Sequence, residues 1–434
     1  MMIIQQVAFL VTLAVAGYFI TKRVRFIRAN IALGKQTIVT GDTSRRWRNV
    51  LLVALGQKKM FKRPLPAVFH IFIYVGFLVI NIEVLEFIID GLAGTHRIFA
   101  PFLGGFYIVL MNFFELLAML VLLACVVFLY RRNVQRLPRF QSPEMDGWPR
   151  RDANLILITE IVLMCAIFTM NATDRELGPF VFSSFIAPLF DSLSPSTLHL
   201  IERIAWWFHI IGILGFAVYV TYSKHLHIFM AFVNTYYARL EPKGQMHNMP
   251  VVTREVRSML GLPAEAAPAD EQAGRFGAKD ISDLARVHLM AAYSCTECGR
   301  CTSECPANKT GKKLSPRKIM MDVRDRMEEI GYAREKQGPS VSGGNADSTG
   351  AGKTLLGDYI TKEEINACTS CNACVEACPV LINPLDIILE LRRYVAMEES
   401  GSPAQWNSMF QNVETNFAPW KFPAADRFNW SKNA

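Results

Sequence analysis

Five long apolar runs in the first half of the chain limit its fold more than any other feature of the sequence. A helix needs about 20 apolar residues to cross a bilayer, and each run is close to that length. Of the 434 residues, 51% are hydrophobic, which is too many for an ordinary soluble protein, while the 19% that are charged exceed what a pure membrane bundle carries. We therefore predict an all-α chain with a membrane part followed by a part in water. The predicted spans are Ile3–Ile20, Ala67–Ile89, Gly105–Tyr130, Leu155–Met170 and Ile204–Tyr222.

Lys and Arg are unevenly divided among the loops between these runs. Twelve lie in residues 21–64 and six in 131–152, whereas one alternate loop carries Arg97 and the other Arg175 and Arg203. Cytoplasmic loops carry the excess of Lys and Arg, so we expect the N-terminus outside and everything after the fifth span in the cytoplasm. The net charge of +8 then reflects membrane orientation rather than a nucleic-acid partner.

Eight of the ten cysteines form two runs of identical spacing, CTECGRCTSECP at 295–306 and CTSCNACVEACP at 368–379. The pattern C-x2-C-x2-C-x3-C-P is typical of [4Fe–4S] binding, and in two-cluster ferredoxins its fourth cysteine ligates the other cluster. The alternative is structural zinc, whose sites usually pair two C-x2-C units across a longer loop. Reduced, metal-binding thiols suit the cytoplasm, in agreement with the loop charges. We predict Cys295, Cys298, Cys301 and Cys378 on the first cluster, and Cys368, Cys371, Cys374 and Cys305 on the second.

Each cysteine run is followed by the signals of a helix start. Ser315 and Asn383 are expected N-caps, and each precedes a Pro at the first helical position. The water-exposed part is therefore predicted to be a helical repeat of two cluster loops. The predicted division is a transmembrane part at 1–232, a linker at 233–285 whose residues 262–275 are rich in Ala, Pro and Glu, a two-cluster ferredoxin part at 286–400 with a flexible insertion at 338–353, and an aromatic tail at 401–434.

Three histidines have positions that suit haem iron. His70 follows the start of the second span and His227 the end of the fifth, so both lie near the cytoplasmic surface on different helices. Two imidazoles at one depth can bind a haem iron from both sides, although a helix-end His often lies only at the interface. His209 stands 18 residues before His227, which is five turns of a continuous helix and places both on one face, with His225 near the opposite face. We predict His70 and His227 as haem b ligands, and His209 as a further candidate.

These motifs carry a resemblance to known families. The cysteine-rich half resembles the helical two-cluster ferredoxin module in the C subunit of heterodisulfide reductase, a module found also in the iron–sulfur subunits of anaerobic glycerol-3-phosphate and succinate dehydrogenases. FHIFIYVGFLVIN around His70 and YSKHLH around His227 resemble the five-helix cytochrome b that forms the gamma subunit of respiratory nitrate reductase and the E subunit of heterodisulfide reductase. The fused arrangement is similar to membrane iron–sulfur oxidoreductases that link electron-transfer flavoprotein or acyl-CoA oxidation to menaquinone.

The sequence departs from that pattern at two places. Ile80 and Asn81 stand where the second helix of the cytochrome family carries another His, so His209 has no obvious partner unless His199, His96 or a Met serves. Fused relatives carry a further cysteine-rich domain, and no cysteine follows Cys378, so the resemblance implies a separate cytoplasmic partner. The stretch FQNVETNFAPWKFP at 410–423 resembles a tail motif of the family and is expected to be a docking surface or a strap on the ferredoxin part.

The expected function is that of a membrane-anchored electron-transfer subunit of a quinone-linked oxidoreductase complex. Electrons would pass among a cytoplasmic partner, two [4Fe–4S] clusters, haem b and the quinone pool, towards menaquinone. The partner implied is a cysteine-rich heterodisulfide-reductase-like protein, a flavoprotein, or both, and the location a bacterial or archaeal inner membrane. The alternatives are a quinol-oxidising subunit of a heterodisulfide-reductase-like enzyme, and a membrane redox sensor or assembly scaffold.

Overall fold

The computed structural model is helical, with the β structure of its described residues limited to two isolated bridges, Lys35 with Ala285 and Leu356 with Ile360. The predicted all-α fold class is therefore confirmed. Most of the predicted insertion at 338–353 and of the Ala-, Pro- and Glu-rich segment at 262–275 lies outside the described residues. The structure describes residues 2–37, 39, 41–174, 180–263, 275–337, 352–421 and 423–432.

Five helices are long and apolar enough to cross a membrane, which confirms the predicted number of spans. Each helix is longer than its apolar run because the backbone hydrogen bonds continue into polar residues at one or both ends. The first differs most, since it runs eleven residues beyond the predicted end at Ile20. The five are α1 (Met2–Ile31), α3 (Pro64–Ala93), α5 (Gly105–Asn133), α6 (Trp148–Thr173) and α7 (Pro195–Val220).

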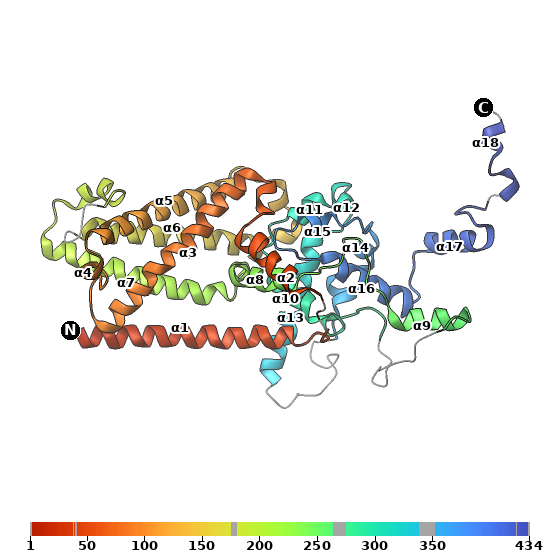
Figure 1. Cartoon of the computed structure of the whole chain (residues 1–434), viewed down its shortest axis with the longest axis horizontal. Helices are drawn as coiled ribbons and strands as arrows, with labels where there is room; N and C mark the ends of the chain where they lie inside the picture. Colours follow the sequence, from red (N-terminus) through yellow and green to blue (C-terminus); the bar gives the residue numbers. More distant parts are fainter. Residues whose placement is uncertain are drawn as a thin grey trace.

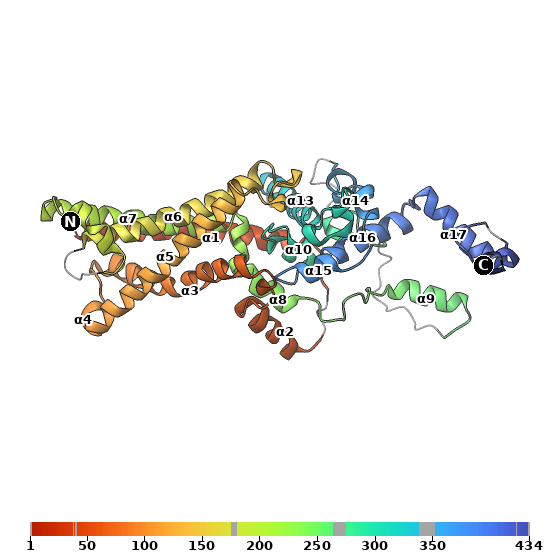
Figure 2. The same cartoon turned by 90° about the horizontal axis from the view of Figure 1, so that it is seen from above.

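These helices form an elongated bundle at one end of the molecule (Figures 1 and 2). α6 packs between α5 and α7, while α3 packs against α5 and α1. Phe9 of α1, Leu117 of α5, Leu163 of α6 and Ile210 of α7 meet in its apolar core. The N-terminus lies at the end of the bundle that is remote from the cysteine runs (Figure 1). We call that end the far end, and the opposite one the cysteine end.

The cysteine runs belong to a second helical part with its own core. Its helices are short except for α13 and α16, which follow the two runs as predicted. Asn383 caps α16 by accepting a hydrogen bond from the Asp386 backbone N–H at 3.2 Å, and the Ser315 hydroxyl accepts from Lys318 N–H at 3.4 Å. The helices are α10 (Arg286–Tyr293), α11 (Arg300–Glu304), α12 (Pro306–Lys309), α13 (Pro316–Gln337), α14 (Lys362–Asn366), α15 (Ala373–Ala377) and α16 (Pro384–Met397).

The extended end of α1 joins the two parts. Arg23 forms an ion pair with Glu328 of α13 at 2.6 Å, and Asn30 donates to the Tyr293 hydroxyl at 2.9 Å. Phe26 and Ile27 of α1 belong to the apolar core of the second part. The basic residues that follow the first apolar run therefore anchor the second part against the bundle, in addition to any role in orientation.

The chain after α7 is not the continuous helix that the sequence analysis assumed. α7 ends at Val220, and α8 (His227–Tyr237) begins only after a turn. The Thr221 hydroxyl donates to Val218 O at 2.7 Å, and the Ser223 hydroxyl accepts from the His225 N–H at 3.0 Å. Such local side-chain bonds compete with the helix and end it here. The prediction of five helical turns between His209 and His227 is therefore wrong.

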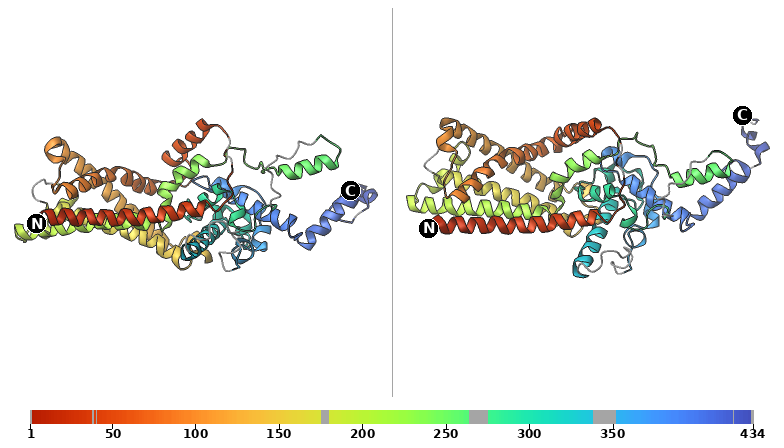
Figure 3. Two further views of the ribbon diagram at one scale, coloured as in Figure 1. Left: turned by 90° about the horizontal axis from the view of Figure 1, so that it is seen from below. Right: turned by 60° about the horizontal axis from the view of Figure 1, so that its bottom comes forward.

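Two helices project from the second part at the end opposite the bundle (Figure 3). α9 (Pro250–Met259) lies in the segment predicted as a linker, and α17 (Ala404–Asn416) begins the tail. The first residues of the predicted tail motif at 410–423 are therefore helical, although their sequence shows little helical period. Trp406, Phe410 and Trp420 are exposed there, at 37%, 52% and 76%.

Candidate functional site

The two cysteine runs fold into the same local structure. In each run the third and fifth residues have positive φ: Glu297 at 55° and Gly299 at 71° in the first, Ser370 at 56° and Asn372 at 60° in the second. Left-handed residues at these positions turn the chain so that a short helix, α11 or α15, follows and carries the third cysteine. Gly and Asn adopt this conformation most readily, so the fifth position matches its local geometry in both runs.

The fourth cysteine of each run lies beside the first three of the other run. The thiols of Cys295, Cys298 and Cys378 are close enough to Cys301 to raise the pKa of its thiol, after the larger effect of burial. Cys368, Cys305 and Cys371 act in the same way on Cys374. This is the arrangement that the predicted cross-ligation requires, and the ligation itself stays a prediction. Within the described ranges, no three His, Cys, Asp or Glu side chains converge as closely as around a single metal ion.

Burial opposes the ionisation of these thiols. It raises the pKa of Cys295 and Cys374 to about 12 and that of Cys378 to about 11, with neighbouring thiols adding to the shift. Backbone N–H groups act in the opposite direction, from Ser370 to the Cys368 sulfur at 3.4 Å and from Ile382 to the Cys378 sulfur at 3.2 Å. Thiolates at these positions therefore need the positive charge of bound metal, as is usual for metal ligands.

A cavity of about 410 Å³ runs from the middle of the bundle to the first cysteine group. α3 contributes the most lining residues, followed by α6, and Cys298 and Pro379 of the second part close its cysteine end. Four of the eight histidines line it: His70, His209, His225 and His227. The structure thus brings all three predicted haem ligands and a predicted cluster ligand to one cavity.

Hydrogen bonds fix the orientation of two of these imidazoles. His227 Nδ1 lies 3.1 Å from Lys224 O, and His209 Nδ1 lies 3.0 Å from Leu163 O. A carbonyl only accepts, so Nδ1 carries the proton in both, and Nε2 keeps its lone pair for a metal or a hydrogen-bond donor. His70 Nδ1 is buried and has no hydrogen-bond partner among the described residues. His70 and His227 are close enough to interact electrostatically across the cavity.

His225 also lines the cavity, contrary to its predicted place near the opposite face. The turn after α7 brings its ring to 5.4 Å from that of His227, with the two rings nearly perpendicular. Burial lowers the pKa of His225 to about 3 and that of His227 to about 4, so both imidazoles are neutral near pH 7. Neutral imidazole is the form that binds metal.

The cysteine end of the cavity is strongly basic. Arg132 and Arg139 lie over the ring of Phe140, at 4.5 and 4.8 Å from its centroid, and Arg300 is buried beside them. Arg132 Nε and Arg139 Nε are buried without a hydrogen-bond partner in the described residues. Burial and the charges of Arg63 and Arg300 lower the pKa of Arg139 to about 10, partly offset by Cys298. This cationic end is therefore suited to an anionic group within the cavity.

The loop before α3 covers the first cysteine group. Arg300 donates to Lys59 O at 3.3 Å, and Arg63 pairs with Glu304 at 2.8 Å. Burial lowers the pKa of Lys59 to about 8, although nearby Cys378 opposes the shift. A second contact is buried, where Lys224 forms an ion pair with Glu297 inside the first run. Basic side chains thus surround the thiols on the side that faces the bundle.

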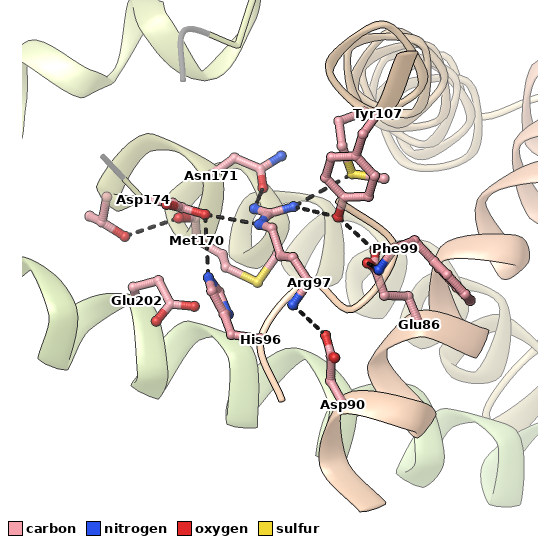
Figure 4. Close-up of polar contacts among 12 residues, drawn as sticks. Glu86, Asp90, His96, Arg97, Phe99, Tyr107, Met170, Asn171, Asp174 and Glu202 are labelled. Carbon is pink, nitrogen blue, oxygen red and sulfur yellow. Dashed lines mark hydrogen bonds and ion pairs between the residues drawn. The ribbon is translucent and has the colours of Figure 1, made fainter. Parts of the chain in front are cut away.

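A separate polar network occupies the far end of the bundle (Figure 4). Arg97 donates to Asp174 at 2.9 Å and to Asn171 at 2.9 Å, and Tyr107 donates to Glu86 at 2.7 Å. Nearly all these groups have partners, so the network ties the far-end loops to the helices. His96 and His199 also lie at this end, near Asp174 and Glu202, and neither lines the cavity. The expectation that one of them pairs with His209 therefore gains no support from the structure.

Several cavity residues were missed by the sequence analysis. Arg139 and Arg300 were counted only as loop charges or as spacer residues, because nothing in a single sequence relates a loop to a distant cysteine run. Glu160 did carry a signal, since an acid within an apolar span is unusual and commonly functional. It lines the cavity midway along α6.

Comparisons with known proteins agree with the cysteine-run assignment. Residues 294–382 match the family described as 4Fe-4S dicluster domain. The chain is 30% identical to the probable iron-sulfur-binding oxidoreductase FadF of Bacillus subtilis, over 98% of this chain and 60% of that protein. It is 27% identical to the EtfAB:quinone oxidoreductase of Syntrophomonas wolfei, over 87% of this chain and 52% of that protein. It thus spans between half and two thirds of these relatives.

The resemblance to heterodisulfide reductase is also found. The C subunit of the ferredoxin/F(420)H(2)-dependent CoB-CoM heterodisulfide reductase of Methanosarcina acetivorans is 29% identical over 28% of this chain and 56% of its own length. No solved structure matches the chain. These likenesses confirm the predicted relation to iron–sulfur oxidoreductases, while the resemblance of the bundle to a cytochrome b stays a prediction.

Proposed function

We propose that this chain is a membrane electron-transfer subunit that passes electrons between a cytoplasmic redox partner and the quinone pool. The observation that carries the proposal is the shared cavity, which is lined by His70 and His227 at its basic end and reaches Cys298 of the first cysteine group. Two candidate redox centres would therefore be adjacent, with no intervening helix. The second cysteine group adjoins the first, since Cys374 is close enough to act on the pKa of Cys301, and we propose that it lies between the cytoplasmic partner and the first group in the order of transfer.

The residues present fit the groups proposed. Each cysteine group offers four thiols, and backbone N–H groups already point at two of the sulfurs. His70 and His227 face one cavity with Nε2 of His227 available, and the unpartnered Nε atoms of Arg132 and Arg139 suit the carboxylates of a haem. Bound iron–sulfur clusters and haem b would accept and release single electrons. The protein positions these groups and excludes water from them.

The direction proposed is from the cytoplasmic donor to the quinone, in practice menaquinone. It is supported by the likeness to a relative whose name couples EtfAB to a quinone. The loop charges support an orientation with the cysteine end in the cytoplasm and the N-terminus outside. The exposed aromatic residues of α17 and the following tail then face the cytoplasm, where a separate cysteine-rich protein or flavoprotein is proposed to bind.

Metal analysis and spectroscopy of the purified protein test the proposal. We expect eight iron atoms with acid-labile sulfide, from two [4Fe–4S] clusters of the predicted pattern, and a b-type absorption band in the reduced protein. Zinc without sulfide would remove the cluster assignment. A reduced spectrum that lacks the b-type band would remove the haem and with it the proposed path to the membrane.

The need for a partner is tested by deleting residues 404–434. We expect the truncated protein to retain its iron and its b-type band, because no residue of this segment belongs to either core. Donor-to-quinone transfer should be lost. Transfer at the full rate would show that the tail is not the docking surface, and turnover of a soluble metabolite by the chain alone would contradict the relay function.

A further inference from the structure

The deep end of the cavity, in the middle of the bundle, has a different chemistry from its basic end. Among the lining residues that the structure describes, the other three histidines all lie at the cysteine end, so His209 of α7 faces no second imidazole at its depth. Its surroundings are apolar, with Phe87 edge-on at 5.8 Å between ring centroids. The polar groups here are His209, Glu160 of α6, and Tyr74 and Asn81 of α3. Such a site offers few, well-separated hydrogen-bonding groups within an apolar wall.

His209 and Glu160 lie at the same depth. Counting from the cysteine end of their helices, His209 is eleven residues from Val220 and Glu160 is twelve from Trp148. At 1.5 Å per residue these intervals are roughly 17 and 18 Å. An acid and an imidazole thus line one cavity near the middle of the membrane, on neighbouring helices.

Both side chains are free to act on a ligand. His209 is 2% exposed and donates its Nδ1 proton to Leu163 O, so Nε2 is an acceptor that is not used by the protein. Glu160 has neither a hydrogen bond nor an ion pair to any residue in the described part of the chain. An ionisable side chain inside a membrane span normally has a partner or marks a functional path.

The cavity also reaches the lipid-facing surface of α3. Leu78 and Asn81 both line it, and both are exposed on the outside of that helix. Asn81 uses its amide N–H on the Phe77 carbonyl, which leaves its side-chain oxygen at the rim. A molecule dissolved in the bilayer could therefore enter beside α3 without passing through water.

We propose that this deep end binds the headgroup of a membrane quinone, with the Glu160 carboxyl group donating to one oxygen and His209 Nε2 accepting from the O–H that forms at the other oxygen on reduction. The inference rests on the proposed function and deepens it by naming the quinone site. A quinone headgroup is flat, apolar and neutral, and it has two oxygens on opposite sides of one ring. An apolar cavity with two protonatable groups at one depth matches it, and lipid is its solvent.

The same groups account for the protons of the reaction. Reduction of one quinone consumes two electrons, which come from the cytoplasmic donor through the cysteine end, and two protons from water, and it forms two O–H bonds. Glu160 donates one proton from its carboxyl group and is reprotonated from water, the second proton comes from water, and His209 Nε2 accepts a hydrogen bond from the O–H that the second proton forms. In the reverse direction Glu160 carboxylate accepts one proton of the quinol, and the other proton passes to water.

Photolabelling of the full chain in lipid nanodiscs tests this site, with an azido-naphthoquinone as the probe and menadione as the competitor. We expect menadione-sensitive label on the peptides of α6 and α7 that contain Glu160 and His209. Menadione affinity should fall about tenfold in Glu160→Gln, because one hydrogen bond to the ligand is weakened. The matched control is Glu83→Gln, which changes a buried acid of α3 that does not line the cavity and should leave affinity within about twofold of wild type.

The b-type absorption band is measured in the same samples, so that a failure of the quinone-site proposal can be distinguished from a failure of the proposed electron-transfer function. Its absence from the wild type would end the relay proposal without touching the labelling result. Label confined to other peptides, or wild-type affinity in Glu160→Gln, would overturn the quinone site. Loss of haem absorbance in His209→Gln would assign His209 to haem and would also overturn it.

Discussion

The cysteine-rich part and the helical bundle assemble their candidate sites in opposite ways. In the cysteine-rich part, each run spans eleven positions from its first to its fourth cysteine, and seven of these positions are spacers. Two residues of each run have a left-handed backbone conformation, which determines the shape of the loop. In the bundle, His70 and His227 are 157 positions apart and meet only because α3 and α8 pack around one cavity. The local spacing of the cysteines determines the first site, and the tertiary packing of the helices determines the second. Substitutions in the two parts should therefore differ in how far from the substituted residue their effects extend.

Loss of one cysteine should have the largest effect, and this effect should appear in the cluster that is held mainly by the other run. In Cys378→Ala we expect loss of the cluster held by Cys295, Cys298 and Cys301, which is about half of the iron, because the fourth ligand comes from the other run. Iron and sulfide content and the EPR spectrum of the reduced protein measure it. Cys165→Ser, which changes an exposed cysteine of α6, is the control. Damage confined to the cluster of Cys368, Cys371 and Cys374 would break the cross-ligation.

Loss of one histidine should empty the bundle site and leave the other part intact. His70→Ala should remove the b-type absorption band while iron and sulfide remain at wild-type levels, because no cysteine ligand depends on α3. His96→Ala, at the far end of the bundle, should change neither quantity. A normal b-type band in His70→Ala would show that the pair His70 and His227 does not hold the haem.

A change at the interface should weaken both parts together. Lys224 and Glu297 form a buried ion pair, with side chains 7% and 2% exposed, across the contact between the turn after α7 and the first run. Lys224→Met leaves Glu297 less compensated, so we expect the free energy of unfolding to fall by about 3 kcal/mol in mild denaturant. Lys243→Met removes an exposed lysine and should cost well under about 1 kcal/mol. Equal stability of the two variants would show that the pair does not hold the parts together.

The smallest effect should come from the backbone of a cysteine loop. Asn372 has φ of 60°, and a β-branched residue there is strained, so Asn372→Val should destabilise the second loop by about 1–2 kcal/mol. Asn372→Gly, which matches Gly299 of the first run, should be nearly neutral. Cluster loss during mild heating compares the two variants, and equal rates would contradict the shared loop geometry.

The two parts also differ in what their sequences reveal. The cysteine spacing and the apolar run lengths are local patterns, and they predict the cluster groups, the five spans and the all-α class from residues near one another. The turn after Val220 depends on hydrogen bonds of Thr221 and Ser223 to nearby backbone groups. The sequence does not reveal this turn because the residues on both sides are apolar and suit a continuous helix. Arg139, Arg300 and Glu160 meet at one cavity through tertiary packing, which no spacing rule encodes. Helix period places a residue on a face only while the helix continues.

The central claim is that electrons cross directly from the first cysteine group to the His70 and His227 site. Flash photoreduction of the purified protein, with haem absorbance followed in time, tests it most directly in wild type and in Cys378→Ala. We predict that electrons reach the haem through the first cluster in the wild type, and that haem reduction becomes at least about tenfold slower in the variant while its b-type band is unchanged. Haem reduction at the wild-type rate in Cys378→Ala, in protein shown to lack the first cluster, would contradict the account.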